Sequence, residues 1–230
     1  MTIGIALKSK DSIILACDSQ ATLGGAPYKT STSKLEQLDQ YHGLVMAGAE
    51  DVSKRVVEML RGYLEREQNS TTERIADMTS ELMADLYRTY GKRFEKDPVT
   101  IANEMSSYFL IGGVDENRGQ QIYRVSSPGI FAPVDHYGLI GSGTFYAGTI
   151  MKKEYVPDMV YNLGLFLATR AVAEASEMDP YVGGEIRLAG IIPSQGFIEI
   201  PQYAEQRFVP LNEELRRVIL GWERKEFGQS

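Results

Sequence analysis

Apolar residues at the start of the chain first alternate with other residues and then follow one another without a break. Every second position from 3 to 7 is apolar, and after a polar stretch the run 13–16 is apolar throughout. Alternation and short apolar runs are both typical of β-strands, so we predict a β-hairpin over residues 2–16. Two further features are expected before the first helix: a loop at 24–27 and a buried strand at 43–48.

The periodicity then changes to that of helices. In residues 52–64 and again in 75–90, apolar side chains recur every three or four positions, which places them on one face of a helix. Ser70, Thr71 and Thr72 are suitable N-caps for the second segment. We therefore predict two antiparallel helices that are joined by a short turn.

The second half of the chain repeats this order of strands followed by helices. We predict strands at 108–114 and 121–125, helices at 144–153 and 158–177, strands at 186–192 and 197–200, and an amphipathic helix at 211–227. Strands that arrive in hairpins favour antiparallel sheets over a parallel doubly wound sheet. The predicted fold class is α+β, a four-layer αββα sandwich of two antiparallel sheets flanked by helices.

Composition and charge restrict the classes of protein. With 43% hydrophobic and 24% charged residues in 230, the chain is typical of one globular domain, 1–230, and we expect a helical extension at about 205–230. The net charge of −7, without a basic block, disfavours nucleic acid as a partner. The longest apolar runs are far shorter than the roughly 18 residues of a membrane helix, and the first residues do not resemble a secretory signal. We therefore expect no membrane partner and a cytoplasmic protein.

The residue types that carry common chemistry are scarce. Cys17 is the single cysteine, which excludes an internal disulfide and a cysteine zinc cluster. His42 and His136 are the two histidines, and neither lies in a catalytic motif, so we interpret both as surface or packing residues. The glycine-rich stretches at 141–143 and 183–184 match no nucleotide-binding spacing. We predict no cofactor and no metal site.

One candidate nucleophile remains at the N-terminus. Thr2 directly follows Met1, and removal of Met1 would give Thr2 a free α-amine. The reference pKa of an α-amine is about 8, so part of it is neutral at pH 7 and can accept the proton of the neighbouring hydroxyl. A lysine near that hydroxyl would stabilise the alkoxide and would need a carboxylate partner. Lys34 and Asp18 are candidates for these roles.

Most of the chain resembles the proteasome β-type subunit family of N-terminal nucleophile hydrolases, including its members without a propeptide. Residues 10–18 (KDSIILACD) are similar to the second strand of the family and its acidic residue, and 19–24 (SQATLG) also resemble the bacterial two-component heat-shock protease. The remaining similar blocks, in the same order along the chain, are 34–35, 43–48, 108–115, 141–143 and 179–184.

The resemblance implies a role for individual residues. Thr2 would be the nucleophile, Lys34 held by Asp18 would tune it, the Gly48 N–H would be the oxyanion donor, and Ser142 and Asp179 would orient the amine and water. Residues expected to bind the substrate are Ala21, Thr22, Thr32, Met46 and Ala49. Val182 stands where the family usually has a small hydroxyl residue.

The resemblance also implies partners and leaves alternatives open. It implies a threonine-type endopeptidase in a homo-oligomeric ring or stacked rings, with α-type subunits or an ATPase unfoldase ring as possible partners and with peptides or unfolded proteins as substrates. Two alternatives are a specialised amidohydrolase or peptide ligase, and a non-catalytic ring subunit. Glu36 and Glu50 are either solvated residues or part of an acidic substrate pocket.

Overall fold

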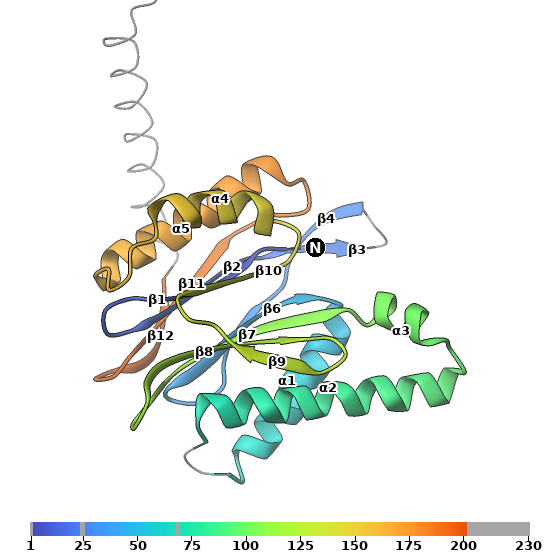
Figure 1. Cartoon of the computed structure of the whole chain (residues 1–230). Coiled ribbons are helices and arrows are strands. Elements are labelled where there is room, and N and C mark those ends of the chain that lie inside the picture. The colour runs from blue at the N-terminus through green and yellow to red at the C-terminus, as the bar shows by residue number, and fades with distance from the viewer. Residues whose placement is uncertain (1, 24–25, 68–69, 202–230) are drawn as a thin grey trace, which may run out of the picture.

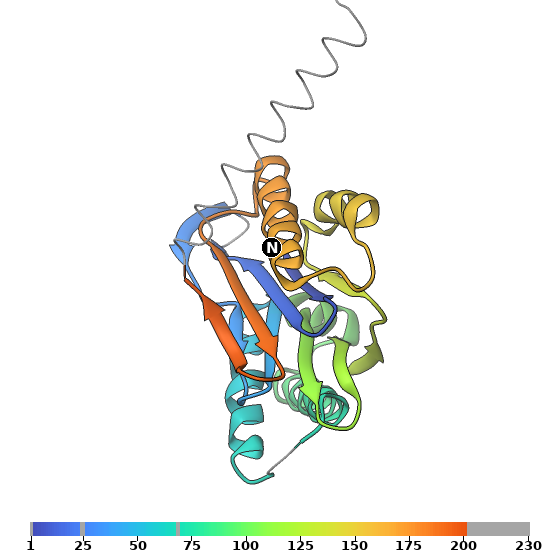
Figure 2. The ribbon, with the colours of Figure 1, turned by 90° about the vertical axis from the view of Figure 1, so that its left-hand side faces the viewer.

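Two five-stranded antiparallel sheets lie face to face, with helices on both outer sides (Figures 1 and 2). The computed structural model describes residues 2–23, 26–67 and 70–201 of the chain. This arrangement is the predicted αββα sandwich. The predicted C-terminal helix at 211–227, and with it the extension at about 205–230, lies outside the described residues.

The first sheet has the strand order β10-β1-β2-β11-β12, and helices α4 and α5 cover its outer face (Figure 1). These elements are β1 (Gly4–Lys8), β2 (Ile13–Asp18), β10 (Tyr137–Ile140), β11 (Ile186–Ile192), β12 (Gly196–Ile200), α4 (Thr144–Glu154) and α5 (Tyr161–Met178). The N-terminal hairpin is confirmed, because β1 pairs with β2 and Gly4 lies opposite Cys17.

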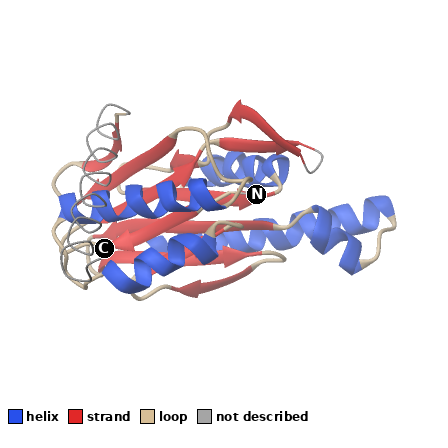
Figure 3. Cartoon of the chain, turned by 90° about the horizontal axis from the view of Figure 1, so that it is seen from above, coloured by secondary structure: helices blue, strands red, loops and turns tan. Residues whose placement is uncertain are grey.

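The second sheet has the order β5-β6-β7-β8-β9 and carries α1 and α2 on its outer face. Figure 3 shows that the end of α2, together with α3, projects beyond the sheets. The elements are β5 (Leu35–Gln37), β6 (His42–Gly48), β7 (Ser107–Asp115), β8 (Gly119–Ser126), β9 (Ile130–Pro133), α1 (Glu50–Leu64), α2 (Thr72–Phe94) and α3 (Pro98–Glu104). A separate hairpin of β3 (Gln20–Leu23) and β4 (Ala26–Ser31) lies beside the N-terminus (Figure 1).

Alternation along the central strands builds the core. In β2, Ile14 and Ala16 pack against the helices α4 and α5, whereas Ile13 and Leu15 pack between the two sheets. Successive side chains of a strand point to opposite faces, so a strand that is buried on both sides is apolar throughout. This explains the unbroken apolar run of β2. The second sheet likewise has one face toward α1 and α2 and one toward the first sheet.

The sequence prediction is wrong in places where hydrophobic periodicity is weak. The segment 24–27, predicted as a loop, contains the start of β4, because β4 begins at Ala26 and its backbone pairs with β3. Helix α3 and the short strands β9 and β10 were not predicted. Thr71 is the N-cap of α2, as predicted, and its hydroxyl accepts a hydrogen bond from the Arg74 N–H at 3.2 Å.

His42 is a buried packing residue that fastens α2 to the second sheet. Its Nδ1 lies 2.9 Å from Asp39, and its Nε2 lies 3.1 Å from Asp115. Asp115 also accepts hydrogen bonds from the backbone N–H and the hydroxyl of Thr72, at 2.9 and 2.7 Å. Burial lowers the pKa of His42, but the hydrogen bonds and charges of Asp115 and Asp39 outweigh this effect and raise it to about 9.

Candidate active site

Residues from both sheets meet at the end of the sandwich where the described chain begins. Thr2 lies two residues before the start of β1, Asp18 is the last residue of β2, Lys34 directly precedes β5, and Gly48 ends β6. The β1–β2 register brings Thr2 beside Asp18, although 16 positions separate them in sequence. The fold thus brings together four of the residues to which the resemblance gives catalytic roles.

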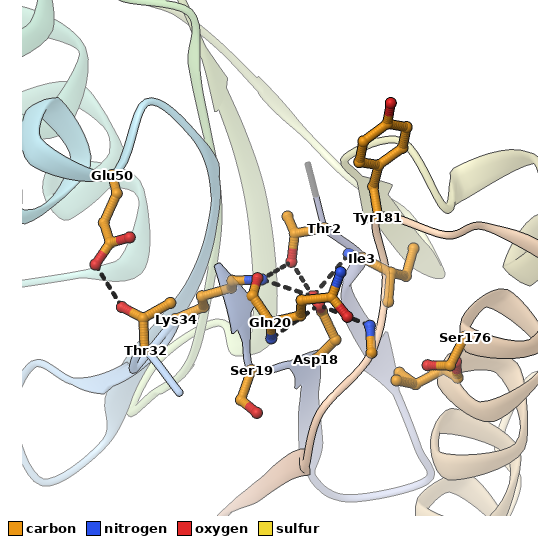
Figure 4. A network of polar contacts seen from close by, with 12 residues as sticks. Thr2, Ile3, Asp18, Ser19, Gln20, Thr32, Lys34, Glu50, Ser176 and Tyr181 are labelled. Carbon is orange, nitrogen blue, oxygen red and sulfur yellow. Dashed lines mark hydrogen bonds and ion pairs between the residues drawn. The ribbon is translucent and has the colours of Figure 1, made fainter. Parts of the chain in front are cut away.

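Asp18 is the centre of a hydrogen-bond network around the Thr2 hydroxyl (Figure 4). Its Oδ1 accepts hydrogen bonds from the Thr2 hydroxyl and, at 3.0 Å, from the Ile3 N–H. Its Oδ2 accepts from the N–H groups of Gln20 and Gly183, each at 3.2 Å. The carboxylate is 1% exposed, so it depends on these donors instead of water. The network therefore fixes the position of Asp18 beside Thr2.

The Lys34 ammonium uses all three of its donor directions inside this network. It donates to Thr2 Oγ1 at 2.6 Å, to Asp18 Oδ1 at 2.9 Å and to the carbonyl oxygen of Gln20 at 2.6 Å. The side chains of Lys34 and Asp18 are 10% and 1% exposed. A buried ion pair is retained at little net cost only when its remaining donors and acceptors are satisfied, as they are here. A fixed positive charge at Thr2 Oγ1 favours the alkoxide form of this hydroxyl.

Glycines let the backbone approach the site closely. Gly48 has φ +106, and a Cβ at this position would lie 2.1 Å from the Ser106 carbonyl oxygen. A Cβ on Gly141 would meet the Thr2 carbonyl oxygen at the same distance. The Gly143 N–H donates to that carbonyl at 3.2 Å. Side chains at Gly48 and Gly141 would displace the backbone that surrounds Thr2.

Ser142 and Asp179, which the resemblance expects to orient the amine and water, make no hydrogen bond to the Thr2 hydroxyl within the described ranges. Ser142 is exposed, and within the described ranges no hydrogen bond joins it to Thr2. Asp179 is buried, and its Oδ1 accepts a hydrogen bond from the Tyr181 N–H at 2.9 Å. Val182 packs into the core beneath α5. Asp179 thus shapes the turn that carries Gly183, which in turn donates to Asp18.

A cavity of about 170 Å³ opens beside Thr2 and Gly48. Of the predicted substrate-binding residues, Ala21, Thr32, Met46 and Ala49 line it. Thr22 lies in β3, and its side chain is outside the described part of the structure. These residues come from β3, the segment between β4 and β5, β6 and the N-cap of α1, which explains why they are scattered in sequence.

Ser53, which sequence reasoning missed, and Glu50, which it named as a candidate, also line this cavity. Ser53 is buried, and its hydroxyl has no hydrogen-bond partner among the described residues. Glu50 accepts hydrogen bonds from Thr32 and from Lys54, both at 2.6 Å. Burial raises the pKa of Glu50, but these hydrogen bonds and the charge of Lys54 outweigh it and lower the pKa. Glu50 is therefore ionised at neutral pH.

The other acidic candidate is not part of the cavity. Glu36 pairs with Arg61 at 2.7 Å and lines a separate surface hollow along α1. The helical spacing could have indicated Ser53, because Ser53 lies one helical turn after Ala49. The structure shows this turn directly, since the Ser53 N–H donates to the Ala49 carbonyl. Nothing in the sequence alone indicated that Glu50 lines the cavity beside Thr2 and that Glu36 does not.

The described part of the chain contains no cluster of three or more His, Cys, Asp or Glu side chains that could hold a metal ion. None of its helices combines the length and the apolar character that a membrane crossing requires. Cys17 is buried, and burial together with the Asp18 charge raises the pKa of its thiol. This thiol is therefore not a reactive thiolate at neutral pH.

Comparison with known proteins agrees with this geometry. The family model described as proteasome subunit matches residues 2–191. The chain is 26% identical over 200 residues to a proteasome subunit beta of Thermoplasma acidophilum, which covers 87% of this chain and 88% of that protein. It is 28% identical over 199 residues to proteasome subunit beta 2 of Pyrococcus furiosus, which covers 86% and 90%. The chain therefore belongs to the proteasome subunit family, as a β-type member.

Proposed function

We propose that this protein is a threonine peptidase whose nucleophile is the Thr2 hydroxyl, exposed as an N-terminal residue when Met1 is removed. The observation that carries the proposal is the position of Thr2 Oγ1, which contacts both Lys34 and Asp18 beside the cavity of about 170 Å³. The buried Lys34 ammonium that donates to the Thr2 hydroxyl lowers the free energy of its alkoxide form.

The reaction follows from these positions. The free α-amine of Thr2 accepts the hydroxyl proton, and Oγ1 attacks the carbonyl carbon of the scissile peptide bond. The Gly48 N–H donates to the resulting oxyanion, which is typically worth about 3 kcal/mol in the transition state. The amine then returns the proton to the leaving nitrogen, which leaves an ester on Thr2. Water hydrolyses this ester with the same amine as base.

Membership of the proteasome subunit family supports a substrate class and an assembly for this proposal. An extended peptide would pair its backbone with the strand that contains Ala21 and Thr22, and the residue before the scissile bond would enter the cavity lined by Met46 and Ala49. The subunit would act in the cytoplasm in a ring or stacked rings, with α-type subunits or an ATPase ring as partners for unfolded proteins. Ser142 and Asp179 would orient water and the amine.

Peptide cleavage by matched variants tests this proposal. The wild-type protein without Met1 is incubated with a mixture of peptides of 8–12 residues, and the products are identified by mass spectrometry. We expect cleavage by the wild type, reduced cleavage by Thr2→Ser and none by Thr2→Ala. Thr149→Ala, an exposed position on α4, is the control and should match the wild type. Cleavage that survives Thr2→Ala, or its absence from the wild type, would overturn the proposal and favour a non-catalytic subunit.

A further inference from the structure

A second and larger cavity, of about 780 Å³, adjoins the active site. It shares Gly48 and Ala49 with the first cavity, and Gly141 and Ser142 form another part of its wall. A peptide that fills the first cavity with the residues before its scissile bond would therefore have a place for the residues after that bond. Gly48, whose N–H is the proposed oxyanion donor, lines both cavities.

The second cavity exists because the core between the sheets ends there. On β7 and β8, Leu110 and Ile122 face the first sheet and belong to the buried inter-sheet cluster. Arg124 pairs with Leu110 in register and follows Ile122 by two positions, so it points to the same face. Tyr108, two positions from Leu110, shares this face and is 38% exposed. Both side chains line the cavity, where apolar packing has stopped.

Arg124 has no ion pair within the described ranges, whereas Arg118 on the same hairpin pairs with Glu73 and Arg61 on α1 pairs with Glu36. One carboxylate, Glu104, also lines the cavity, but the Lys96 ammonium contacts both of its oxygens, at 2.6 and 2.5 Å. The cavity therefore combines an unpaired guanidinium with a neutralised acid, which is the environment that attracts an anion from outside.

We propose that Arg124 binds the C-terminal carboxylate of the peptide substrate, so that the enzyme preferentially removes short segments from carboxyl termini. This inference rests on the proposed function, because it assigns a binding site to the part of the substrate that is released in the same reaction. A guanidinium presents parallel N–H donors that match the two oxygens of a carboxylate. A neutral amide at the C-terminus cannot make this paired, charged contact. Endopeptidase cleavage far from a chain end would gain nothing from Arg124.

Sheet geometry sets the length of the released segment. Gly48 pairs with Ser107 on β7, and Arg124 lies on the next strand, three positions along from the level of Ser107. Arg124 is thus two strands away from Gly48 and three residues farther along. With about 3.4 Å per residue and about 4.8 Å between strands, the Cα atoms of Gly48 and Arg124 are roughly 14 Å apart. An extended peptide spans that distance in about four residues, and fewer when the arginine side chain leans toward the site. Released segments of roughly two to four residues fit this span.

Paired peptides with a free carboxylate or an amide at the C-terminus test the inference. Both series have the same sequence, with one to six residues after a cleaved bond. For two to four residues, we expect the wild type to show a kcat/KM about tenfold higher for the carboxylate form, which corresponds to about 1.4 kcal/mol, with the difference in KM. Arg124→Gln should remove this preference, Arg124→Lys should retain part of it, and Arg118→Gln on the same hairpin is the control.

The outcomes separate this inference from the proposed function. Equal cleavage of both series by the wild type, or a preference unchanged in Arg124→Gln, would overturn the carboxylate site while peptidase activity stands. If the wild type cleaves no peptide, calorimetry measures how tightly the Thr2→Ala variant binds the same peptide pairs. Tighter binding of the carboxylate form that Arg124→Gln removes supports the site, and equal binding overturns it. The preference should also shrink at 0.5 M salt, where exposed charges are screened.

Discussion

At the residue scale, Lys34 determines how the Thr2 hydroxyl behaves. Its ammonium contacts Thr2, Asp18 and the Gln20 carbonyl, and apart from the Thr2 hydroxyl the other contacts of Asp18 come from backbone N–H groups. Because those backbone contacts remain when the lysine charge is removed, the carboxylate keeps most of its hydrogen bonds. Loss of the lysine charge should therefore leave the fold intact but less stable, since a buried carboxylate loses its charge partner, and should impair catalysis as well.

We predict that Lys34→Met lowers kcat for peptide cleavage by about 100-fold or more, since proton transfer and charge stabilisation each contribute about that much. Methionine keeps the length of the side chain and removes the charge. Kinetics and thermal unfolding are measured together, with the exposed Lys92→Met as control. A variant that is folded and as active as the wild type would show that Lys34 has no catalytic role.

His42 gives the protein a predictable dependence of stability on pH. Its pKa is raised from 6.5 to about 9 in the folded state, so its contribution is complete below pH 6.5 and is lost as the pH rises through about 9. The contribution is on the order of 3 kcal/mol. We predict that the free energy of unfolding falls more steeply between pH 6 and pH 10 in the wild type than in His42→Asn. This is measured by urea unfolding, and exposed His136→Asn should match the wild type. Equal slopes for all three would contradict the prediction.

At the element scale, two glycines in adjacent elements should respond in opposite directions to the same substitution. Gly48 ends β6 with φ +106, and a Cβ there would lie 2.1 Å from a backbone oxygen, so Gly48→Ala should lower the melting temperature. Gly62 lies inside α1, and a Cβ there meets no atom within 4 Å. Gly62→Ala should stabilise the protein by about 0.5–1 kcal/mol. Calorimetry of both variants measures this, and a stabilising Gly48→Ala would contradict the geometry.

The elements also show how far sequence could predict the fold and the site. Strands and helices with strong periodicity, such as β2 and α2, were predicted, whereas β4 and α3 were not, because they are short and their positions do not alternate. Lys34 and Asp18 were candidates from the chemistry of an N-terminal nucleophile and received their roles from the resemblance, whereas the geometry of their ion pair depends on pairing between distant strands. Arg124 gave no sequence signal at all, because its isolation follows from where the inter-sheet core ends.

At the scale of the whole molecule, the exposed apolar residues point to assembly. Several large apolar side chains around α4 and α5 are about half or more exposed, which is typical of surfaces that are covered in an oligomer. They are Phe145, Val156, Val160 and Leu163. We predict that native mass spectrometry finds a multiple of 25.6 kDa that is consistent with a ring. A stable monomer at micromolar concentration would contradict this.

The intact mass of the protein, before and after incubation with a peptide epoxyketone, tests the central claim most directly. This reagent closes a ring only with a hydroxyl and a free α-amine on the same residue. We predict a chain that lacks Met1 and gains one inhibitor, with no addition to Thr2→Ala. A chain without Met1 that gains no inhibitor, or an adduct that persists in Thr2→Ala, would contradict the assignment of Thr2 as the nucleophile.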